Sequence, residues 1–543
     1  MSWQAASIGE VFRRVAARAP ARTALVFLGE RYTYAWLDAA SDAIASALAR
    51  RGVAAGDRAL IYASHCPQWV IAWLALQKLG AVAVPVTHFY GAAELGAVAS
   101  DSGAETIFCM DTGFGHLDKI RAGTSLRRVV VLGVAELLPI WKRALGHLLD
   151  RIPTGKTRAS SGVERFRDLL REQGPPPAPE VPGGATAEML YTGGTTGSPK
   201  GVPISHALFL ESCGEQRRAS LPAVPAGEEV VLQGAPLYHI LGQVVGLGAL
   251  LAGETVVLLP KMNLDAVFDH VDRYQATTIL GTPTFYRNLL EHDRIDDYRL
   301  GSLRFAFSGG DALPAETSAR WRRLTGKPLY QGYGATETCG GVFLTHAGDD
   351  APEGTVGRLC AHQRALVVDA GTLEPVEPGQ PGELLVSSRH MVSAYWNKPD
   401  ESSRCFVELQ GQRWYRTSDV VRIDPGGWVF FHDRSVDVIK HKGYRVAASK
   451  IDNALQEHRA VVACCTIGVP DPAAGERIKS FVVLREGAEG VNSIELIRWC
   501  RERLAPYEVP QYIEFRDMLP RSKVGKILRR ELRAEEKRKA EET

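Results

Sequence analysis

The sequence predicts an α/β protein with at least two domains, and three observations lead to this expectation. A chain of 543 residues is too long for one ordinary hydrophobic core. Its first third alternates strand-like apolar runs with helical patterns, joined by short glycine-bounded connections. Such alternation is typical of a parallel sheet covered by helices. Beyond residue 433 the pattern becomes compact α+β over about 110 residues, a reasonable size for a small second domain.

The alternation in the first third can be followed element by element. The runs TALVF (23–27) and RYTY (31–34) flank LGE and predict a hairpin. Thr33 can cap the helix that follows, and Gly52 can close it. A strand ALIYA, a helix over Pro67–Leu79 and a buried strand AVAVPV come next. This strand–helix–strand order supports the parallel sheet.

The composition excludes several classes of protein. Hydrophobic residues make up 45% and charged residues 23%, and the net charge is +2, which gives no reason to expect nucleic acid as a partner. The nine cysteines contain no CxxC pair, so we expect reduced thiols in a cytoplasmic protein. No apolar run reaches the roughly 18–20 residues of a membrane span.

One segment stands apart from this pattern. Residues 137–156 are amphipathic and basic and include Trp141. The segment could lie on a membrane surface, at the inner face of the cytoplasmic membrane, or simply cover the core. The sequence leaves both interpretations open. A stretch rich in proline and glycine at residues 174–184 then predicts a surface linker.

The loop YTGGTTGSPKG (191–201) predicts a phosphate site. Its four glycines let several backbone N–H groups point at one anion, its threonines and serine add hydroxyl donors, and Lys200 adds positive charge. A flexible surface loop is the alternative. The loop lacks the GK[ST] ending of a P-loop, and near TGKT (154–157) Asp150 stands where that motif needs its first glycine.

The loop resembles the signature loop of the adenylate-forming superfamily of acyl-CoA synthetases, luciferases and nonribosomal peptide adenylation domains. Further motifs follow in that family's order: PLYHILG (from 236), SGGDALP (308), QGYGATET (331), GELLVSS (382), YRTSDV (415), DRSVDVIKHKGYRV (433) and PRSKVGKILRREL (520). The resemblance covers essentially the whole chain and is closest in character to bacterial AMP-forming fatty acyl-CoA ligases.

The resemblance implies a reaction and an organisation. A carboxylic acid and ATP give an acyl-adenylate and pyrophosphate, and the acyl group then passes to CoA, with Mg²⁺ assisting. It also implies a large domain over 1–432 with α/β sheets and a β-barrel-like subdomain. A hinge over 433–436 and a small mobile α+β domain over 437–543 would follow.

The same resemblance assigns residues to the adenylation step. Lys526 would bridge the carboxylate and the α-phosphate, Thr336 would bind that phosphate, and His239 would lie near the acyl end. Glu337 would hold Mg²⁺, a hard cation that suits a carboxylate. Asp419 and Arg434 would bind the ribose. The phosphates would meet Thr192, Gly193, Gly194, Thr195, Thr196, Gly197 and Lys200, and the adenine pocket would comprise Gly309, Gly310, Asp311, Gln331, Gly332, Tyr333 and Gly334.

The resemblance also assigns the thiol step. Lys442 and Gly443 would lie near the pantetheine, and Lys440 near the nucleotide or the thiol. The sequence departs from the family at the hinge, where Val436 replaces the usual Asp or Lys. A β-branched apolar residue restricts the backbone, so we expect an altered balance between the two domain arrangements.

The acid itself is less defined. No aspartate near PLYHI would pair an amino-acid ammonium group. The Gly-Gly of the loop and the basic insertion at 137–156 resemble fatty acyl-CoA ligases, which favours a medium- or long-chain fatty acid. An aryl or alicyclic acid, a carrier-protein acceptor in place of CoA, and a silent nucleotide-binding relative remain alternatives. Monomer and homodimer both stay open.

Overall fold

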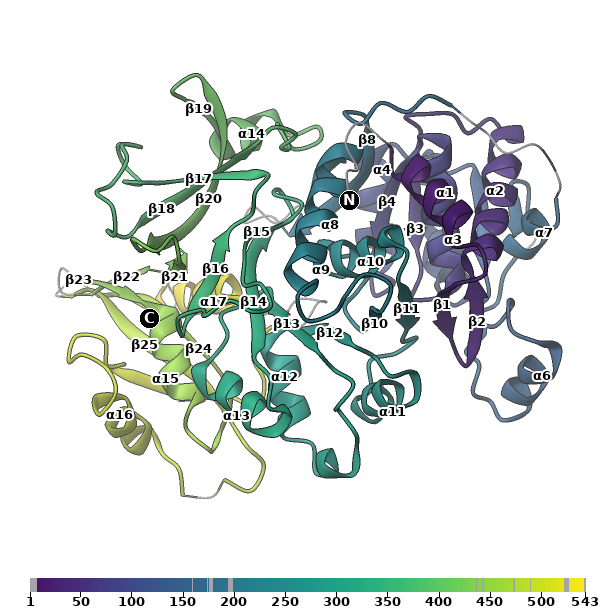
Figure 1. Cartoon of the computed structure of the whole chain (residues 1–543). Helices are drawn as coiled ribbons and strands as arrows, with labels where there is room; N and C mark the ends of the chain where they lie inside the picture. Colours follow the sequence, from purple (N-terminus) through teal and green to yellow (C-terminus); the bar gives the residue numbers. More distant parts are fainter. Residues whose placement is uncertain are drawn as a thin grey trace.

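The computed structural model describes residues 7–158, 160–172, 174, 179–193, 199–434, 438–441, 444–471, 474–488, 490–521 and 527–541. These residues form three β-sheets and the helices that cover them (Figure 1). The predicted α/β class is confirmed, and so is the small α+β unit at the end of the chain.

The first sheet contains the strand–helix alternation predicted for the first third of the chain. Its order is β7-β6-β5-β3-β4-β8-β9, and only the β8–β9 pair is antiparallel. Its central strands β4 and β5 are buried along their whole length, because helices cover both faces. The strands are β3 (Arg58–Tyr62), β4 (Val82–Val86), β5 (Thr106–Met110), β6 (Arg128–Leu132), β7 (Val163–Arg165), β8 (Thr186–Gly193) and β9 (Pro199–Ser205).

The helices around this sheet begin and end where the sequence signals predict. The Thr33 hydroxyl accepts from the Trp36 N–H and caps α2. The next helix, α3, has the predicted bounds and ends at Gly80 with φ +70°, a conformation that glycine adopts without strain. Every residue of α3 is buried. The helices are α1 (Ile8–Arg18), α2 (Tyr34–Arg50), α3 (Pro67–Leu79), α4 (Ala92–Ser102), α5 (Phe114–Ile120), α6 (Ile140–Leu148) and α7 (Phe166–Leu170), with 3-10 turns η1 (Asp111–Gly113) and η2 (Arg121–Gly123).

The second sheet is parallel at its centre, in the order β14-β13-β12-β10-β11-β1, with β2 antiparallel at the edge. The predicted hairpin forms β1 and β2, but it joins this sheet beside β11 and not the sheet of its neighbours in sequence. The strands are β1 (Thr23–Phe27), β2 (Glu30–Thr33), β10 (Val230–Gln233), β11 (Thr255–Leu258), β12 (Thr278–Gly281), β13 (Phe305–Gly309) and β14 (Leu329–Ala335). Its helical elements are α8 (His206–Ser220), α9 (Ile240–Gly242), η3 (Gln243–Leu247), α10 (Gly248–Ala252), α11 (Leu264–Tyr274), α12 (Pro283–Leu290), η4 (Ile295–Asp297) and α13 (Ala315–Thr325).

Antiparallel strands extend the second sheet beyond β14, in the order β15-β16-β21-β20-β18-β17. The resemblance implies a β-barrel-like subdomain here. In the structure these strands, green in Figure 1, continue the second sheet. The elements are β15 (Gly340–Leu344), β16 (Thr355–Leu359), β17 (Gln363–Val368), β18 (Gly382–Ser388), α14 (Pro399–Cys405), β19 (Phe406–Leu409), β20 (Gln412–Ile423) and β21 (Val429–Arg434).

The third sheet lies in the C-terminal unit and has its own core around Ile451, Leu455 and Leu496. Leu504 follows the helix Ser493–Arg501 and is buried in the same core. Arg485 reaches across to Glu291 of the large unit at 3.1 Å. The elements are β22 (Val438–His441), β23 (Tyr444–Ala447), α15 (Ala448–Gln456), β24 (Val461–Asp471), β25 (Gly475–Leu484), α16 (Ser493–Arg501), β26 (Tyr512–Phe515) and α17 (Arg529–Glu541).

Two further predictions can be compared with the structure. All nine cysteines are free thiols and eight of them are buried, as expected of core residues. No helix in the described part of the chain combines the length and the apolar composition needed to cross a membrane.

Candidate active site

The candidate site lies where three parts of the chain meet. Strands β8 and β9 bring the ends of the phosphate loop from the first sheet, and β13 and β14 end side by side in the second. A short segment around Tyr395 joins them, because Trp396 N–H donates to Gly201 O on β9 at 2.8 Å. Trp396 Nε1 also donates to Asp101 O at 2.9 Å, and the Tyr191 hydroxyl donates to the Asp101 carboxylate at 2.7 Å.

Tyr395 connects the two charged groups predicted for the phosphate side. Its hydroxyl donates to Glu337 Oε1 at 2.8 Å, and the Lys200 ammonium lies over its ring, 4.8 Å from the centroid. All three side chains are buried. Burial first, and the nearby Glu337 carboxylate second, raise the pKa of Tyr395 far above its usual value, so its hydroxyl remains a donor. The sequence analysis missed Tyr395, since nothing nearby in sequence marks it as a partner of residue 337.

Asp419 and Tyr333 form a second polar pair. The Tyr333 hydroxyl donates to Asp419 Oδ2 at 2.6 Å, and the Asp419 backbone N–H donates to Thr417 Oγ1. Asp419 is buried. Burial, followed by the Asp419 carboxylate, raises the pKa of Tyr333 well above its ordinary range. In the sheet Asp419 is the direct partner of Arg434, so the two residues predicted for the ribose share one position of the β20–β21 ladder.

Glycines at the ends of β13 and β14 allow close packing of the backbone. Gly309 and Gly332 are paired across the two strands. A Cβ on Gly332 would stand 2.6 Å from Leu344 Cδ2, and one on Gly334 would stand 2.0 Å from Gly340 O. Gly310 has φ +88°, where a side chain would be strained. Gly332 and Gly334 therefore require glycine for close packing, and Gly310 requires it for its backbone conformation, whatever they bind.

The turn after β14 carries Thr336 and Glu337. Thr338 Oγ1 accepts from Ala335 N–H at 2.9 Å, and Cys339 N–H donates to Thr336 O at 3.0 Å. Thr336 is half-buried beside Glu337. The turn is thus fixed by a backbone bond and by the Thr338 hydroxyl. The side chains of Thr336 and Glu337 take no part in these two bonds. Gln331 pairs with Thr345 through its backbone, and Asp311 is exposed.

His239 lies at the start of α9, where its Nδ1 accepts from Leu241 N–H at 3.3 Å. A second histidine, which sequence reasoning missed, holds this loop. His65 Nδ1 lies 3.1 Å from Leu259 O, and His65 Nε2 accepts from Leu237 N–H at 3.1 Å. One ring nitrogen must donate while the other accepts, so the imidazole is neutral. Burial accordingly lowers the pKa of His65 to about 4.

Several predicted residues lie outside the described part of the chain: Gly194, Thr195, Thr196, Gly197, Val436, Lys442, Gly443 and Lys526. Thr192 and Gly193 end β8, opposite Lys200 and Pro199 of β9. Lys440 is exposed on β22, and its backbone N–H donates to Glu476 Oε2 at 2.6 Å.

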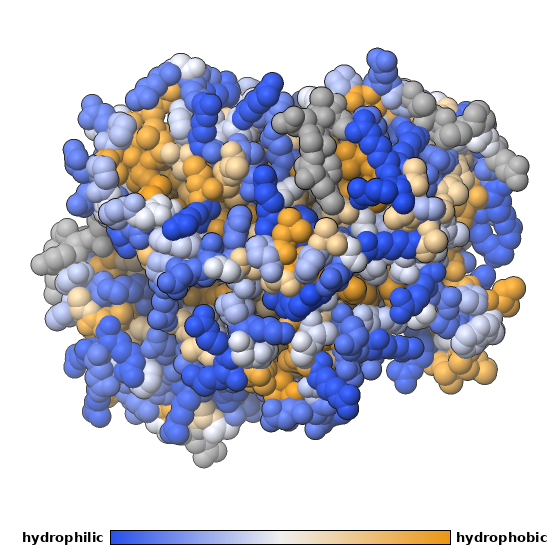
Figure 2. Space-filling view, viewed as in Figure 1, coloured by the Kyte–Doolittle hydropathy of each residue, from blue (hydrophilic) through white to orange (hydrophobic). Residues whose placement is uncertain are grey.

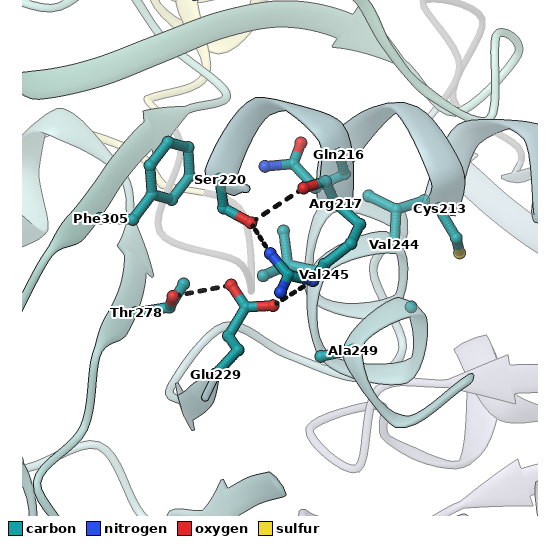
Figure 3. Close-up of a pocket in the computed structure, with 11 residues that line it drawn as sticks. Cys213, Gln216, Arg217, Ser220, Glu229, Val244, Val245, Ala249, Thr278 and Phe305 are labelled. Atoms are coloured by element: carbon teal, nitrogen blue, oxygen red, sulfur yellow. Dashed lines mark hydrogen bonds and ion pairs between the residues drawn. The ribbon is translucent and has the colours of Figure 1, made fainter. Parts of the chain in front are cut away.

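A small cavity lies behind the site, between α8, η3 and the second sheet, with a volume of about 10 Å³ (Figure 3). It has room for one water at most, so it is too small for an acyl chain. Arg217 crosses it and pairs with Glu229 at 3.2 Å and with Glu254 at 3.1 Å. Thr278 Oγ1 donates to Glu229 at 2.8 Å. We interpret this buried ion-pair cluster as structural.

The residues present fit a magnesium–nucleotide complex. Glu337 offers a buried carboxylate, already oriented by Tyr395. The described residues contain no group of three or more His, Cys, Asp or Glu side chains that could hold a metal ion alone. Mg²⁺ bound at Glu337 would therefore take its other oxygens from phosphates and water, as it commonly does in nucleotide sites.

Comparison with known proteins identifies the family of this chain. A profile of AMP-binding enzymes matches residues 12–396, and one of the AMP-binding enzyme C-terminal domain matches 450–526. The long-chain-fatty-acid–CoA ligase of Bacillus subtilis (strain 168) is 32% identical over 96% of this chain and 93% of its own. A feruloyl-CoA synthase of an Amycolatopsis species is 31% identical over 96% and 97%.

The fold has close counterparts among solved structures. An anthranilate CoA ligase in complex with anthranoyl-AMP superposes with a TM-score of 0.85 at 24% identity, covering 99% of this chain and 98% of that one. The chain belongs to the AMP-binding enzyme family, and within it to the AMP-forming acyl-CoA synthetases, which join a carboxylic acid to CoA using ATP.

Proposed function

We propose that this enzyme activates a medium- or long-chain fatty acid. The acid and ATP give an acyl-adenylate and pyrophosphate, and the CoA thiol then displaces AMP to give the acyl-CoA. The full-length relatives named as long-chain-fatty-acid–CoA ligases, at 30–32% identity, support the choice of acid. The single structural observation that carries the chemistry is the Lys200–Tyr395–Glu337 arrangement between the two large sheets.

In the first step two anions must meet, and negative charge builds on the α-phosphorus. Lys200 supplies positive charge from the phosphate loop. Glu337 would hold Mg²⁺, which would neutralise charge on the phosphates. Thr336, beside Glu337, donates to the α-phosphate. Lys526 approaches from the C-terminal unit and neutralises both the carboxylate and the α-phosphate. Support for Lys526 comes from its place in the family motif.

The nucleoside binds between the ends of β13, β14 and β20. Asp419 accepts from the ribose hydroxyls, with Tyr333 holding the carboxylate in place. The glycine-lined ends of β13 and β14 admit the adenine. His239, at the start of α9, faces the acyl end of the substrate. Its loop is held by His65, so the acyl end has a rigid wall.

The second step uses the small unit in another position. A hinge over 433–436 turns the unit 437–543, which withdraws Lys526 and brings Lys442 and Gly443 to the thiol channel, with Lys440 nearby. Such closure needs only a few residues to absorb the dihedral change. The separate core of the third sheet supports this proposal, because a unit with its own core can turn as a body.

An aryl acid is the second candidate. It is favoured by the feruloyl-CoA synthase that is 31% identical over nearly the whole length of both chains. Residues that line an acyl pocket decide between the two, and a shared scaffold does not determine them.

The test is to incubate the protein with ATP, Mg²⁺ and CoA and a panel of acids, from acetate to palmitate with benzoate, cyclohexanecarboxylate and ferulate. We expect AMP and acyl-CoA in equal amounts, with the highest rate for a fatty acid of medium or long chain. A preference for ferulate or benzoate would replace the fatty acid with the aryl acid. AMP without acyl-CoA would assign another acceptor, such as a carrier protein.

A further inference from the structure

Helix α6 is an exposed apolar helix on the outside of a folded domain. It contributes no buried residue. The exposed fractions are 80% for Ile140, 63% for Trp141, 48% for Leu145, 82% for Leu148 and 57% for Leu149. A nine-residue helix is too short to be stable by itself in water, and such a helix in a soluble domain usually buries its apolar face. Figure 2 shows the resulting hydrophobic projection at the lower right, where Figure 1 places α6.

The apolar side chains share one side of the helix. Trp141, Leu145 and Leu148 follow each other at spacings of four and three residues, and Leu149 follows Leu145 by four. Residues so spaced lie on one face. Leu28, in the turn between β1 and β2, is 40% exposed, and Lys142 Nζ donates to its carbonyl at 3.1 Å. Leu28 therefore extends the apolar surface beyond α6.

The surface is held in place by its flanks. Lys142 pairs with Glu30 at 2.6 Å. Leu138, before the helix, is buried in the large core, and Ile152, after it, packs against the same core. Since both ends are fixed to the domain, the helix presents its apolar side outward as a defined feature.

The surroundings of α6 are strongly basic. Residues 137–158 contain five lysines and arginines and one aspartate, a net charge of +4 in a chain whose total is +2. Arg151, Lys156 and Arg158 are exposed. Apolar side chains on a short helix, with cations beside them, are the complement of a bilayer surface with anionic headgroups. A protein partner that covered this face would need to match both the apolar projection and the positive charge.

We propose that α6 and the neighbouring Leu28 dock this enzyme on an anionic lipid bilayer. Ile140, Trp141, Leu145, Leu148 and Leu149 enter the interface between headgroups and acyl chains, while the basic residues on its flanks contact the headgroups. This inference concerns attachment alone and stands whichever acid the active site takes.

The experiment measures vesicle binding by the whole protein, by flotation with vesicles of phosphatidylcholine alone or mixed with phosphatidylglycerol. We expect at least tenfold stronger partitioning to the anionic vesicles. The variant W141S/L145S/L148S should lose binding by more than tenfold. The variant R151Q/K156Q should lose about 25-fold on anionic vesicles only, at about fivefold for each cation near such a surface.

The matched control is I494S/M518S, which removes two apolar side chains of similar exposure, 68% and 79%, from the C-terminal unit. It should bind vesicles as the wild type does. Formation of AMP by detergent-free protein, with no vesicles present, should be equal in all variants and shows that they are folded. In the wild type, a blue shift of tryptophan emission on binding should report Trp141, the exposed tryptophan among those the structure describes.

Three results would overturn the proposal. One is a wild type that ignores anionic vesicles at millimolar lipid, and another is a triple variant that binds them as well as the wild type. The third is self-association of the wild type that the triple variant abolishes, without lipid binding by either. That result would assign the surface to a second copy of this chain.

Discussion

At the scale of single residues, the site depends on tyrosines that hold carboxylates. Tyr395 orients Glu337 at 2.8 Å, and Tyr333 orients Asp419 at 2.6 Å. Both hydroxyls have pKa values raised by burial and by their carboxylate partners, so both carboxylates retain a donor at any physiological pH. A buried carboxylate with one oxygen fixed is well prepared to accept from a ligand with the other.

The proposed role of Asp419 as a ribose ligand predicts that its replacement affects ATP and 2′-deoxy-ATP differently. D419N should reduce kcat/KM for ATP by about ten- to a hundredfold, the range for hydrogen bonds to a charged group. The loss of kcat/KM for 2′-deoxy-ATP should be smaller, because this nucleotide lacks one of the two ribose hydroxyls that would donate to Asp419. Kinetics of AMP formation with both nucleotides measure this. Equal losses for the two nucleotides would show that Asp419 acts through the fold, and Y333F should give a weaker version of the same pattern.

The raised pKa of Glu188 predicts that the stability of the protein depends on pH. The residue is fully buried on β8, where Trp73 Nε1 donates to it at 3.2 Å, and burial raises its pKa from 4.5 to about 8. Between these values the folded protein holds a proton that the unfolded chain has released. Stability from this group is therefore present at acidic pH and falls as pH rises, by about 1.4 kcal/mol per pH unit for one proton.

The variant E188Q keeps an acceptor for Trp73 and removes the titration. Its free energy of unfolding, relative to that of the wild type, should rise between pH 5.5 and pH 7.5. Chemical denaturation at both pH values measures the difference. E316Q replaces an exposed residue on α13. Its free energy of unfolding should change with pH as that of the wild type does. A difference between wild type and E188Q that stays constant with pH would refute the raised pKa.

At the scale of elements, helix α8 carries a buried arginine next to an exposed one. Arg217 is buried with Glu229 and Glu254, whereas its neighbour Arg218 is exposed and pairs with Glu215. R217M should destabilise the large domain by about 3–5 kcal/mol, because it leaves the buried Glu229 carboxylate without its cation. R218M should cost less, because the Arg218 guanidinium is exposed and the buried Glu215 carboxylate also has His362 beside it at 3.9 Å.

Urea denaturation of both variants tests this comparison on one helix. The same side chain is replaced in the two cases, and each arginine pairs with a buried carboxylate, so the difference reports the burial of the cation. Equal stability of R217M and R218M would mean that the carboxylates around residue 217 find other partners.

The sequence predicted local elements well, since their signals are local. The Thr33 cap, the proline that starts α3 and Gly80 that ends it mark boundaries by backbone chemistry alone. What the sequence could not predict was long-range: the hairpin of β1 and β2 joins the second sheet through β11. Likewise Tyr395 meets Glu337, and His65 supports the loop before His239, across 58 and 172 residues. Such partners are chosen by the packed fold, and no periodic pattern encodes them.

At the scale of the whole molecule, we propose that one small unit serves two steps. The third sheet has its own core and meets the large unit through polar contacts such as Arg485–Glu291. Lys526 belongs to the sequence of this unit and is proposed to act in adenylation. K526A should therefore reduce the rate of acyl-adenylate formation by more than about a hundredfold. It should leave transfer from supplied acyl-AMP to CoA within a few-fold of the wild type.

Single-turnover measurement of each half-reaction tests the separation. K523A, three residues away in the same basic stretch, is the matched control and should affect neither step. Equal loss of both half-reactions in K526A would contradict the assignment of this lysine to adenylation alone.

Transfer of carboxylate oxygen to AMP shows whether the acid is activated as an acyl-adenylate. The fatty acid with the highest rate in the panel would be supplied with both carboxylate oxygens as ¹⁸O, together with ATP, Mg²⁺ and CoA. Attack of the carboxylate on the α-phosphorus leaves one of its oxygens on AMP. We therefore predict one ¹⁸O in each AMP and one in each acyl-CoA. AMP without label, or label in ADP or inorganic phosphate, would contradict it.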